Sequence, residues 1–187
     1  MFYKIAFGIM RFFFVIVFKF VRIDIPEDID GSAIICSNHF SMWDPISIAL
    51  SLDRPVHFMA KKELFENKFV GKILSGLNAF PVDREKQSDM KSIRKAISIL
   101  KDEEIVGIFP EGTRVKNPDI SNMKDGVGFL SAKGNAPIYV FQITSEYKFR
   151  SKVEVKFKKC INFDDYEGKT KDKISKITED IYYAMYE

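Results

Sequence analysis

Residues 32–52, SAIICSNHFSMWDPISIALSL, combine a predicted strand, a turn and a predicted helix in one short stretch. The apolar run in SAIICS (32–37) is typical of a buried strand. DPISIALSL (44–52) predicts a short helix, with Asp44 as its N-cap and Pro45 at its first position. A strand that runs through a turn into a helix is the basic unit of an α/β domain.

The alternation of strands and helices continues along the chain. The clearest helix is 88–101, where Met90, Ile93, Ile97 and Leu100 recur at helical spacing. Further helices are predicted over 67–77 and 171–187, and further strands over 20–25, 56–60, 79–82, 104–109, 136–143 and 153–157. We therefore predict an α/β fold with a mixed, mostly parallel central sheet flanked by helices. Residues 18–187 are expected to form this single domain.

Composition excludes several other classes of protein. A chain of 187 residues suits one domain, and 46% hydrophobic residues exclude a disordered chain. The net charge of +3 is too small to indicate a nucleic-acid partner. Cys36 and Cys160 stand far apart with no C-x-x-C pattern and no histidine cluster, so neither a zinc site nor a disulfide framework is supported. We expect no metal and no cofactor.

Residues 1–17 are expected to form a membrane-associating amphipathic helix. Lys4 and Arg11 lie about 20° apart in helical projection, so a narrow basic stripe runs along a wide apolar surface. The longest run without a charge, 12–18, is much shorter than the roughly 20 residues of a membrane span. A core helix of a soluble protein is the alternative. Four basic residues and no acidic one over 1–23 favour the interface of an anionic membrane, on its cytoplasmic face.

Polar side chains follow the ends of three predicted strands, where open α/β sheets bind their ligands. His39 and Asp44 follow the first strand, Arg84 the second, and Glu111 and Arg114 the third. A base, a carboxylate and two guanidinium groups could together form a site for acyl or phosphoryl transfer. Taken singly, these residues are weak signals: a lone histidine in a turn is more often structural than catalytic, and an arginine after a strand is usually solvated or in a surface ion pair.

The sequence contains no motif for the main competing chemistries. There is no G-x-S-x-G elbow of an α/β-hydrolase and no G-x-x-x-x-G-K-[ST] phosphate-binding loop. GVG at 126–128 lacks the third glycine of a dinucleotide-binding fingerprint and follows no predicted strand.

Four ordered blocks carry a resemblance to a known family: NHFSMWD (38–44), GLNAFPVDR (76–84), FPEGTR (109–114) and APIYV (136–140). In this order they resemble the glycerolipid acyltransferase family, of the 1-acylglycerol-3-phosphate (lysophosphatidic acid) acyltransferase type. The resemblance extends over residues 20–160 and also includes FMAKKELF (58–65) and Lys124-Asp125-Gly126. The fourth block departs from the family at Val140, where a second proline is common, and this departure concerns the acyl-donor side.

The resemblance implies catalysis by His39 and Asp44. A neutral imidazole can take the proton of the acceptor hydroxyl as that hydroxyl attacks a thioester carbonyl. Asp44 would accept a hydrogen bond from the other ring nitrogen, which sets the tautomer and stabilises the imidazolium. The acceptor hydroxyl is itself the nucleophile, so Ser41 is expected to have a turn or capping role only.

The resemblance also implies how the acceptor phosphate is bound. Arg84 and Arg114 are the candidates, because a guanidinium group makes charge-assisted, fork-shaped bonds to phosphate. Lys61 is a weaker candidate for the same phosphate.

Five further residues have implied roles around the substrates. Glu111 would hold an arginine or the glycerol hydroxyl, Gly112 would permit close backbone approach, and Thr113 would donate its hydroxyl. Pro137 and Ile138, in the fourth block, would lie on the acyl-donor side.

The expected activity is transfer of a fatty acyl group from acyl-CoA or acyl carrier protein to 1-acylglycerol 3-phosphate, giving phosphatidic acid for phospholipid biosynthesis. One alternative acceptor is another lysolipid, and a second is glycerol 3-phosphate. A non-catalytic lipid-binding protein of the same fold is a third possibility, although a pure binder has no need of the His39–Asp44 pair.

Overall fold

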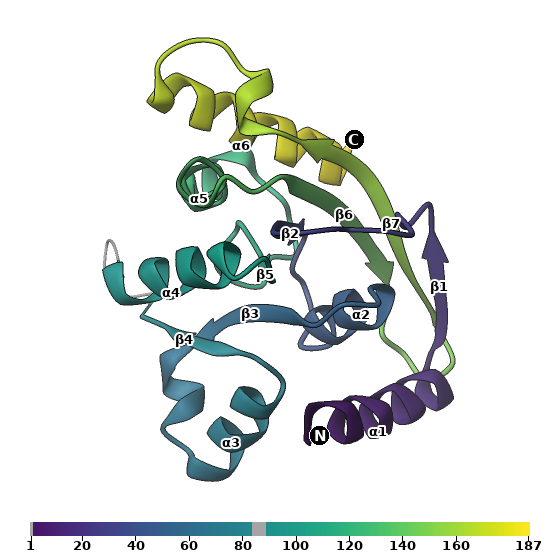
Figure 1. Ribbon diagram of the computed structural model, residues 1–187. Helices are drawn as coiled ribbons and strands as arrows, with labels where there is room; N and C mark the ends of the chain where they lie inside the picture. The colour runs from purple at the N-terminus through teal and green to yellow at the C-terminus, as the bar shows by residue number, and fades with distance from the viewer. Residues whose placement is uncertain (1, 84–88) are drawn as a thin grey trace.

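The computed structural model describes residues 2–83 and 89–187, and for residues 2–6 the backbone alone. Among these residues, seven strands form one sheet in the order β1-β7-β6-β2-β5-β3-β4 (Figure 1). Neighbouring strands are parallel except β6 and β7, which are antiparallel. The predicted mixed, mostly parallel sheet is therefore confirmed. The strands are β1 Lys19–Ile23, β2 Ala33–Ser37, β3 Val56–Lys61, β4 Phe80–Val82, β5 Ile105–Ile108, β6 Ile138–Ser145 and β7 Lys152–Ile161.

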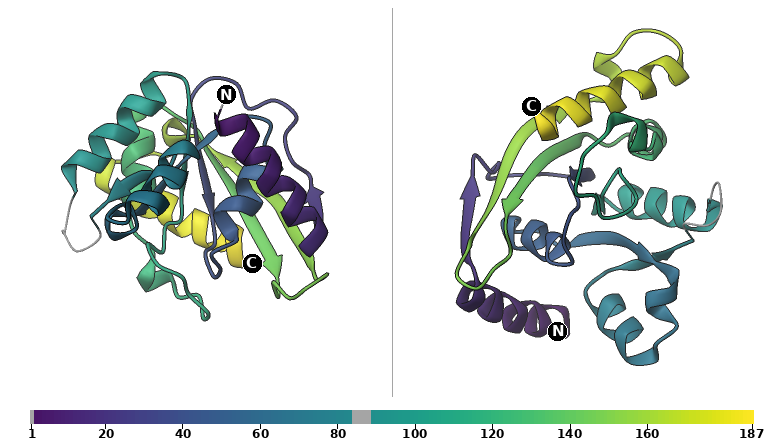
Figure 2. Two further views of the ribbon diagram at one scale, coloured as in Figure 1. Left: turned by 90° about the horizontal axis from the view of Figure 1, so that it is seen from below. Right: turned by 180° about the vertical axis from the view of Figure 1, so that it is seen from behind.

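Helices cover both faces of this sheet (Figures 1 and 2). Three of them, α4, α5 and α6, pack on one face, whereas α2 packs on the other. The helices are α1 Phe2–Val17, α2 Asp44–Ser51, α3 Lys68–Gly76, α4 Met90–Lys101, α5 Gly126–Gly134 and α6 Thr170–Tyr186. Short 3₁₀ turns occur at Lys62–Phe65, Ile120–Asn122 and Phe163–Asp165.

The central strand β2 explains the continuous apolar run in the sequence. Hydrogen-bonded neighbours, β5 and β6, flank it on both edges, and all five of its residues are buried. Ile34 and Cys36 pack toward α4, α5 and α6, whereas Ala33 and Ile35 pack toward α2. A strand that is covered on both faces favours apolar residues on both sides, so the residues Ala33 to Cys36 do not alternate with polar ones.

Three sequence-based expectations need correction. Asp44 is the first residue of α2 and not its N-cap; Trp43 holds the N-cap position without a side-chain cap. Helix α5 was not predicted, because its three glycines obscure the apolar pattern; Gly128 lets α5 approach Ile174 of α6 closely. Strand β7 has ten residues, far beyond the predicted 153–157, because it pairs with β1 on one edge and β6 on the other.

Helix α1 occupies residues 2–17 of the predicted range 1–17 and docks on the domain by one side only. Phe14 is buried in a small apolar cluster with Phe18, Leu50 and Val153. Other large apolar side chains of α1 point into solvent, namely Ile9, Phe12, Phe13, Val15 and Ile16. Within the described part of the chain, no helix has the length and apolar character that crossing a membrane requires.

Candidate active site

The side chains of His39 and Asp44, which the sequence analysis pairs, are in contact. β2 ends at Ser37, and the turn that follows carries His39 back toward the first residue of α2. Nδ1 of His39 lies 2.9 Å from Oδ2 of Asp44, whose side chain is fully buried. The same oxygen accepts bonds from the backbone N–H groups of Phe40 (2.7 Å) and Ser41 (2.6 Å). These bonds satisfy a buried carboxylate, which would otherwise be strongly unfavourable.

Tyr147, in the turn after β6, donates a hydrogen bond to the other oxygen of Asp44, at 2.8 Å. Its hydroxyl is also 2.9 Å from Oγ of Ser47. Burial, and then the nearby negative charge of Asp44, raise the pKa of Tyr147, so its hydroxyl keeps the donated proton. The sequence contains no local signal for this contact, since Tyr147 and Asp44 are 103 residues apart.

Tyr147→Phe is expected to lower kcat about ten- to a hundredfold and to leave KM for both substrates nearly unchanged. A hydrogen bond to a charged group contributes about 1.5–3 kcal/mol, and about 1.4 kcal/mol corresponds to tenfold in rate. Steady-state kinetics with both substrates check this, and Tyr183→Phe, at an exposed position of α6, is the matched control. A variant that raises KM and leaves kcat unchanged would contradict a positioning role for Tyr147.

Glu111 supports the backbone of His39. β2 pairs with β5 so that Cys36 faces Ile108, and His39 and Glu111 each stand three residues further on. The N–H of His39 donates to Oε2 of Glu111 at 2.9 Å, and the hydroxyl of Tyr186 donates to Oε1. Burial raises the pKa of Glu111, while these two bonds lower it. Both oxygens are thus engaged, and the contact of Glu111 with an arginine or a glycerol hydroxyl stays a prediction.

Contacts to both the ring and the backbone hold His39 in place. The ring stacks on Phe109, with centroids 4.2 Å apart and planes inclined by 21°. The backbone N–H of Val115 donates to the carbonyl of His39 at 2.8 Å. Nε2 makes no hydrogen bond to any residue that the structure describes. Nδ1 is therefore committed to Asp44, and Nε2 is the nitrogen that can meet a substrate.

The loop after β5 brings exposed polar groups beside His39. Arg114 directly precedes Val115, and its guanidinium makes no hydrogen bond or ion pair to other described residues. Thr113 is also exposed. Gly112 has a left-handed φ of +67°, and a Cβ there would come within 2.7 Å of Nζ of Lys124. This glycine thus leaves room for the amine of Lys124, and its predicted role in close approach to a substrate stays a prediction.

The other residues predicted to bind the substrates lie in different parts of the chain. Lys61, at the end of β3, is exposed, with its amine 3.7 Å from a carboxylate oxygen of Glu63. Arg84 lies outside the described residues. Pro137 and Ile138 lie at the amino end of β6, away from the edge that carries His39, and Ile138 is buried against Ile34 of β2. The structure does not bring these two residues to the site.

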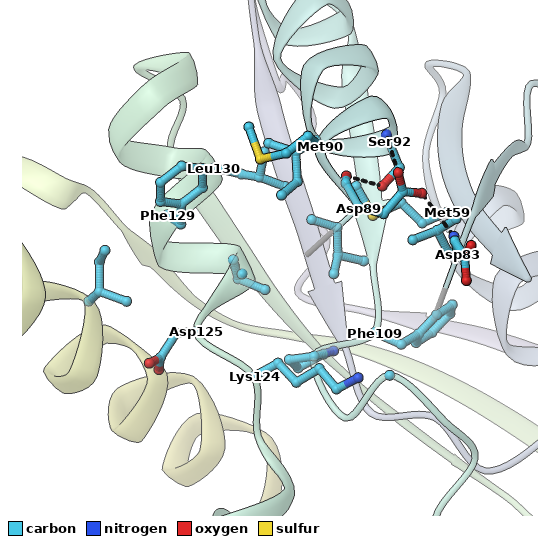
Figure 3. Close-up of a pocket in the computed structure, with 18 of the residues that line it drawn as sticks. Met59, Asp83, Asp89, Met90, Ser92, Phe109, Lys124, Asp125, Phe129 and Leu130 are labelled. Atoms are coloured by element: carbon cyan, nitrogen blue, oxygen red, sulfur yellow. Dashed lines mark hydrogen bonds between the residues drawn. The ribbon is translucent and has the colours of Figure 1, made fainter. Parts of the chain in front are cut away.

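A cavity of 780 Å³ adjoins the site (Figure 3). Phe109, which stacks on His39, lines it together with Gly112 and Lys124. Most other lining residues are apolar and come from β3, α4, β5 and α5, among them Met59, Met90, Ile93, Ile108, Phe129 and Leu130. Figure 3 shows Lys124 and Phe109 around one part of the cavity, and Met90, Phe129 and Leu130 around another. An apolar cavity with a few polar groups is typical of a small-molecule site.

Sequence reasoning missed Lys124, Tyr147 and Tyr186 as parts of the site. A signal for Lys124 was present, because Lys124-Asp125-Gly126 is one of the stretches that resemble the family. No signal in the sequence indicated Tyr147 or Tyr186. Both residues follow the last of the four blocks, 136–140, in the sequence.

A His–Asp pair at the carboxyl edge of a mostly parallel sheet, next to an apolar cavity, defines an α/β protein equipped for proton transfer to or from an apolar substrate. The family model described as Acyltransferase matches residues 20–144. The chain belongs to this acyltransferase family.

Two curated relatives of the chain carry the names of acyltransferases. The chain is 42% identical over 110 residues to a 1-acyl-sn-glycerol-3-phosphate acyltransferase of Bacillus subtilis (strain 168), with 58% of this chain and 54% of that protein covered. It is 30% identical over 144 residues to the protein of that name from Streptococcus pneumoniae, with 73% and 52% covered. The chain thus spans about half the length of the curated relatives it matches.

A solved structure supports the fold. The crystal structure of the 1-acyl-sn-glycerophosphate (LPA) acyltransferase PlsC from Thermotoga maritima superimposes with a TM-score of 0.69 at 24% sequence identity. The match covers 96% of this chain and 76% of that one. At this identity the likeness establishes the α/β architecture, and the chemistry must be argued from the site.

Proposed function

We propose that this protein transfers a fatty acyl group from a thioester donor, acyl-CoA or acyl carrier protein, to the free hydroxyl of 1-acylglycerol 3-phosphate, giving phosphatidic acid. The observation that carries the proposal is the His39–Asp44 pair, with Nε2 of His39 open beside the cation-bearing loop at 109–114. The printed names of the relatives, which are 1-acyl-sn-glycerol-3-phosphate acyltransferases, support the same substrate class.

The residues suggest the following sequence of proton transfers. Nε2 of His39 takes the proton of the acceptor hydroxyl while the oxygen attacks the thioester carbonyl. Asp44, held by four hydrogen bonds, stabilises the imidazolium that forms. When the tetrahedral intermediate collapses, the C–S bond breaks and the imidazolium returns the proton to the departing thiolate. No acyl-enzyme intermediate is needed, because the acceptor supplies the nucleophile.

The surrounding groups fit the other parts of the substrates. Arg114 offers a guanidinium group with no described partner, and the amine of Lys124 lies next to Gly112 in the same region. Both are suited to the acceptor phosphate. The apolar cavity behind Phe109 is suited to a fatty acyl chain, because burying methylene groups there removes apolar surface from water.

The proposal is tested by an assay of the purified full chain with a panel of acceptors and both donor types, with products read by mass spectrometry. The panel contains 1-acylglycerol 3-phosphate, lysolipids with other headgroups, and glycerol 3-phosphate. Phosphatidic acid is the expected main product. If the protein prefers another acceptor, that acceptor is its substrate. If it transfers no acyl group at all, the result favours a non-catalytic lipid-binding protein.

Arg114→Ala is expected to raise KM for the phosphorylated acceptor about ten- to a hundredfold, with a much smaller change in KM for the thioester. A lost charge-assisted bond to phosphate costs about 1.5–3 kcal/mol. Arg114→Lys should recover only part of the loss, because the planar fork is absent. Arg22→Ala, at an exposed arginine of β1, is the control. Equal rises for both substrates would argue against a phosphate contact.

We further propose that α1 lies in the plane of the membrane interface. A spanning helix would place Arg11 near the bilayer centre at about 2.5–3.5 kcal/mol, whereas an in-plane helix gains about 1 kcal/mol per basic residue from anionic headgroups. Arg11, Phe12 and Phe13 are all exposed on α1. Lys4, the other member of the basic stripe, has a side chain outside the described residues. This placement corresponds to association with the cytoplasmic face of an anionic membrane.

Phe12→Ser together with Phe13→Ser should release much of the protein from vesicles, and activity should fall more on bilayer substrate than on detergent-dispersed substrate. Arg11→Glu should weaken binding to anionic vesicles only. These exposed positions are better tests than deletion of residues 1–17, because Phe14 is part of the core and its loss would destabilise the domain. A tag at Met1 that is protected on the far side of sealed vesicles would show a true span and overturn the in-plane proposal.

A further inference from the structure

Helix α3 presents an apolar face to solvent on the side away from the domain. Gly71 marks its inward side, because a Cβ there would come within 2.9 Å of the carbonyl oxygen of Phe65. Each helical residue turns about 100°, so Phe69 and Ile73 lie about 40° apart and on the side opposite Gly71. Phe69 is 75% exposed, Ile73 39% and Val70 37%. Exposing such a group of large apolar side chains to water is unfavourable, and a contiguous apolar surface of this kind marks a site of interaction.

The charge of α3 indicates what kind of partner this is. Lys68 and Lys72 are both exposed, and the helix, KFVGKILSG, contains no acidic residue. Lys72 lies about 60° from Phe69 in projection, so a cation borders the apolar face. An apolar face bordered by lysine fits the headgroup region of an anionic bilayer, where the amine meets lipid phosphates and the ring enters the acyl boundary.

The position of α3 in the fold supports the same partner. α1 and α3 contact each other and lie at the same end of the molecule, whereas α6 lies at the opposite end (Figures 1 and 2). The turn that carries His39 is close to α1, since Trp43 packs on Phe14 at 5.9 Å between ring centroids. Its neighbour Met42 is 75% exposed. Exposed apolar side chains thus occur on α1, on α3 and on the catalytic turn.

We propose that α3 is a second membrane contact, whose face of Phe69, Val70 and Ile73 enters the same anionic leaflet on which α1 lies. The inference rests on the proposed interfacial placement of α1. A single in-plane helix would leave the domain free to rotate about the axis of that helix. A second contact away from this axis would fix the tilt of the domain on the membrane. A lipid acceptor could then pass from the leaflet to His39 without crossing water.

The direct test is depth-dependent quenching of single labels. Cys160, which is exposed, is changed to serine, and Cys36 is kept because it is fully buried. Single cysteines then replace Phe69 on α3, Phe12 on α1 and Tyr183 on α6, and each carries an environment-sensitive fluorophore. The probes are phosphatidylglycerol-containing vesicles with brominated acyl chains. Quenching is expected at positions 69 and 12, and none at position 183.

The outcomes separate this inference from the proposed placement of α1. Quenching at 12 without quenching at 69 overturns the inference and leaves the α1 proposal intact. Quenching at 69 alone would show a single membrane contact on α3, and it would overturn both the α1 proposal and the inference that α3 is a second contact beside α1. Absence of quenching at both positions overturns both.

A substitution experiment gives an independent readout. Phe69→Ser together with Ile73→Ser should raise the lipid concentration for half-maximal vesicle binding more than tenfold, since both lost side chains would be buried in lipid. Activity on detergent-dispersed acceptor should be unchanged. Tyr183→Ser removes a ring that is 47% exposed on α6 and should change neither quantity. Equal vesicle binding by the α3 variant and the wild-type chain would overturn the inference.

Discussion

Replacing His39 with alanine is expected to lower kcat by about 10²–10⁴-fold, the range for loss of a positioned general base. The fold should tolerate the change, because the contacts that hold this turn use the backbone of residue 39. Its N–H donates to Glu111 and its carbonyl accepts from Val115, and alanine keeps both groups. Binding of the acceptor lipid should therefore persist while turnover is lost.

The matched control is His57→Ala. This second histidine lies on β3, with Nε2 2.8 Å from a carboxylate oxygen of Glu104, and it makes no described contact with His39. Its replacement should leave kcat close to the wild-type value. Single-turnover rates, acceptor binding and thermal unfolding of both variants give the comparison. A folded His39→Ala protein with near-normal kcat would rule out His39 as the base.

Asp44→Asn is expected to lower kcat by about 10²–10⁴-fold while the protein stays folded. The amide oxygen can still accept the bonds from Phe40 and Ser41, and the amide N–H₂ can donate to Tyr147, whose hydroxyl proton can turn to Ser47. What the variant loses is the negative charge that stabilises the imidazolium. Transition-state stabilisation should thus fall much more than the free energy of unfolding.

Asp44→Ala provides the contrast, because it leaves buried donors without an acceptor. Each unsatisfied buried donor costs about 1–3 kcal/mol, so the melting temperature of this variant should fall well below that of Asp44→Asn. Asp53→Asn, at an exposed aspartate just beyond α2, should change neither kcat nor stability. If Asp44→Asn kept kcat within tenfold of wild type, the carboxylate would be a structural brace and not part of the catalytic pair.

The sequence alone determined the features that depend on neighbouring residues or on the order of strands. The continuous apolar run of β2 indicated a strand buried on both faces, and its position just before His39 placed that residue at the ligand-binding edge. The rule that ligands gather beyond the carboxyl ends of parallel strands also grouped His39, Glu111 and Arg114 at one edge, whereas the pairing of β2 with β5, which brings Glu111 to His39, came from the structure. Likewise, the distribution of charge in residues 1–17 was sufficient to predict an amphipathic helix.

Only the tertiary structure decided which distant groups complete the site. Tyr147 reaches Asp44 across 103 residues from the turn between β6 and β7, and Tyr186 reaches Glu111 across 75 residues from α6, which packs on one face of the sheet. The apolar cavity exists only where α4 and α5 pack beside β5, and the exposed face of α3 follows from Gly71 facing inward. Local patterns report the periodicity of one element, whereas side-chain contacts between elements depend on how all of them pack, which no short stretch encodes.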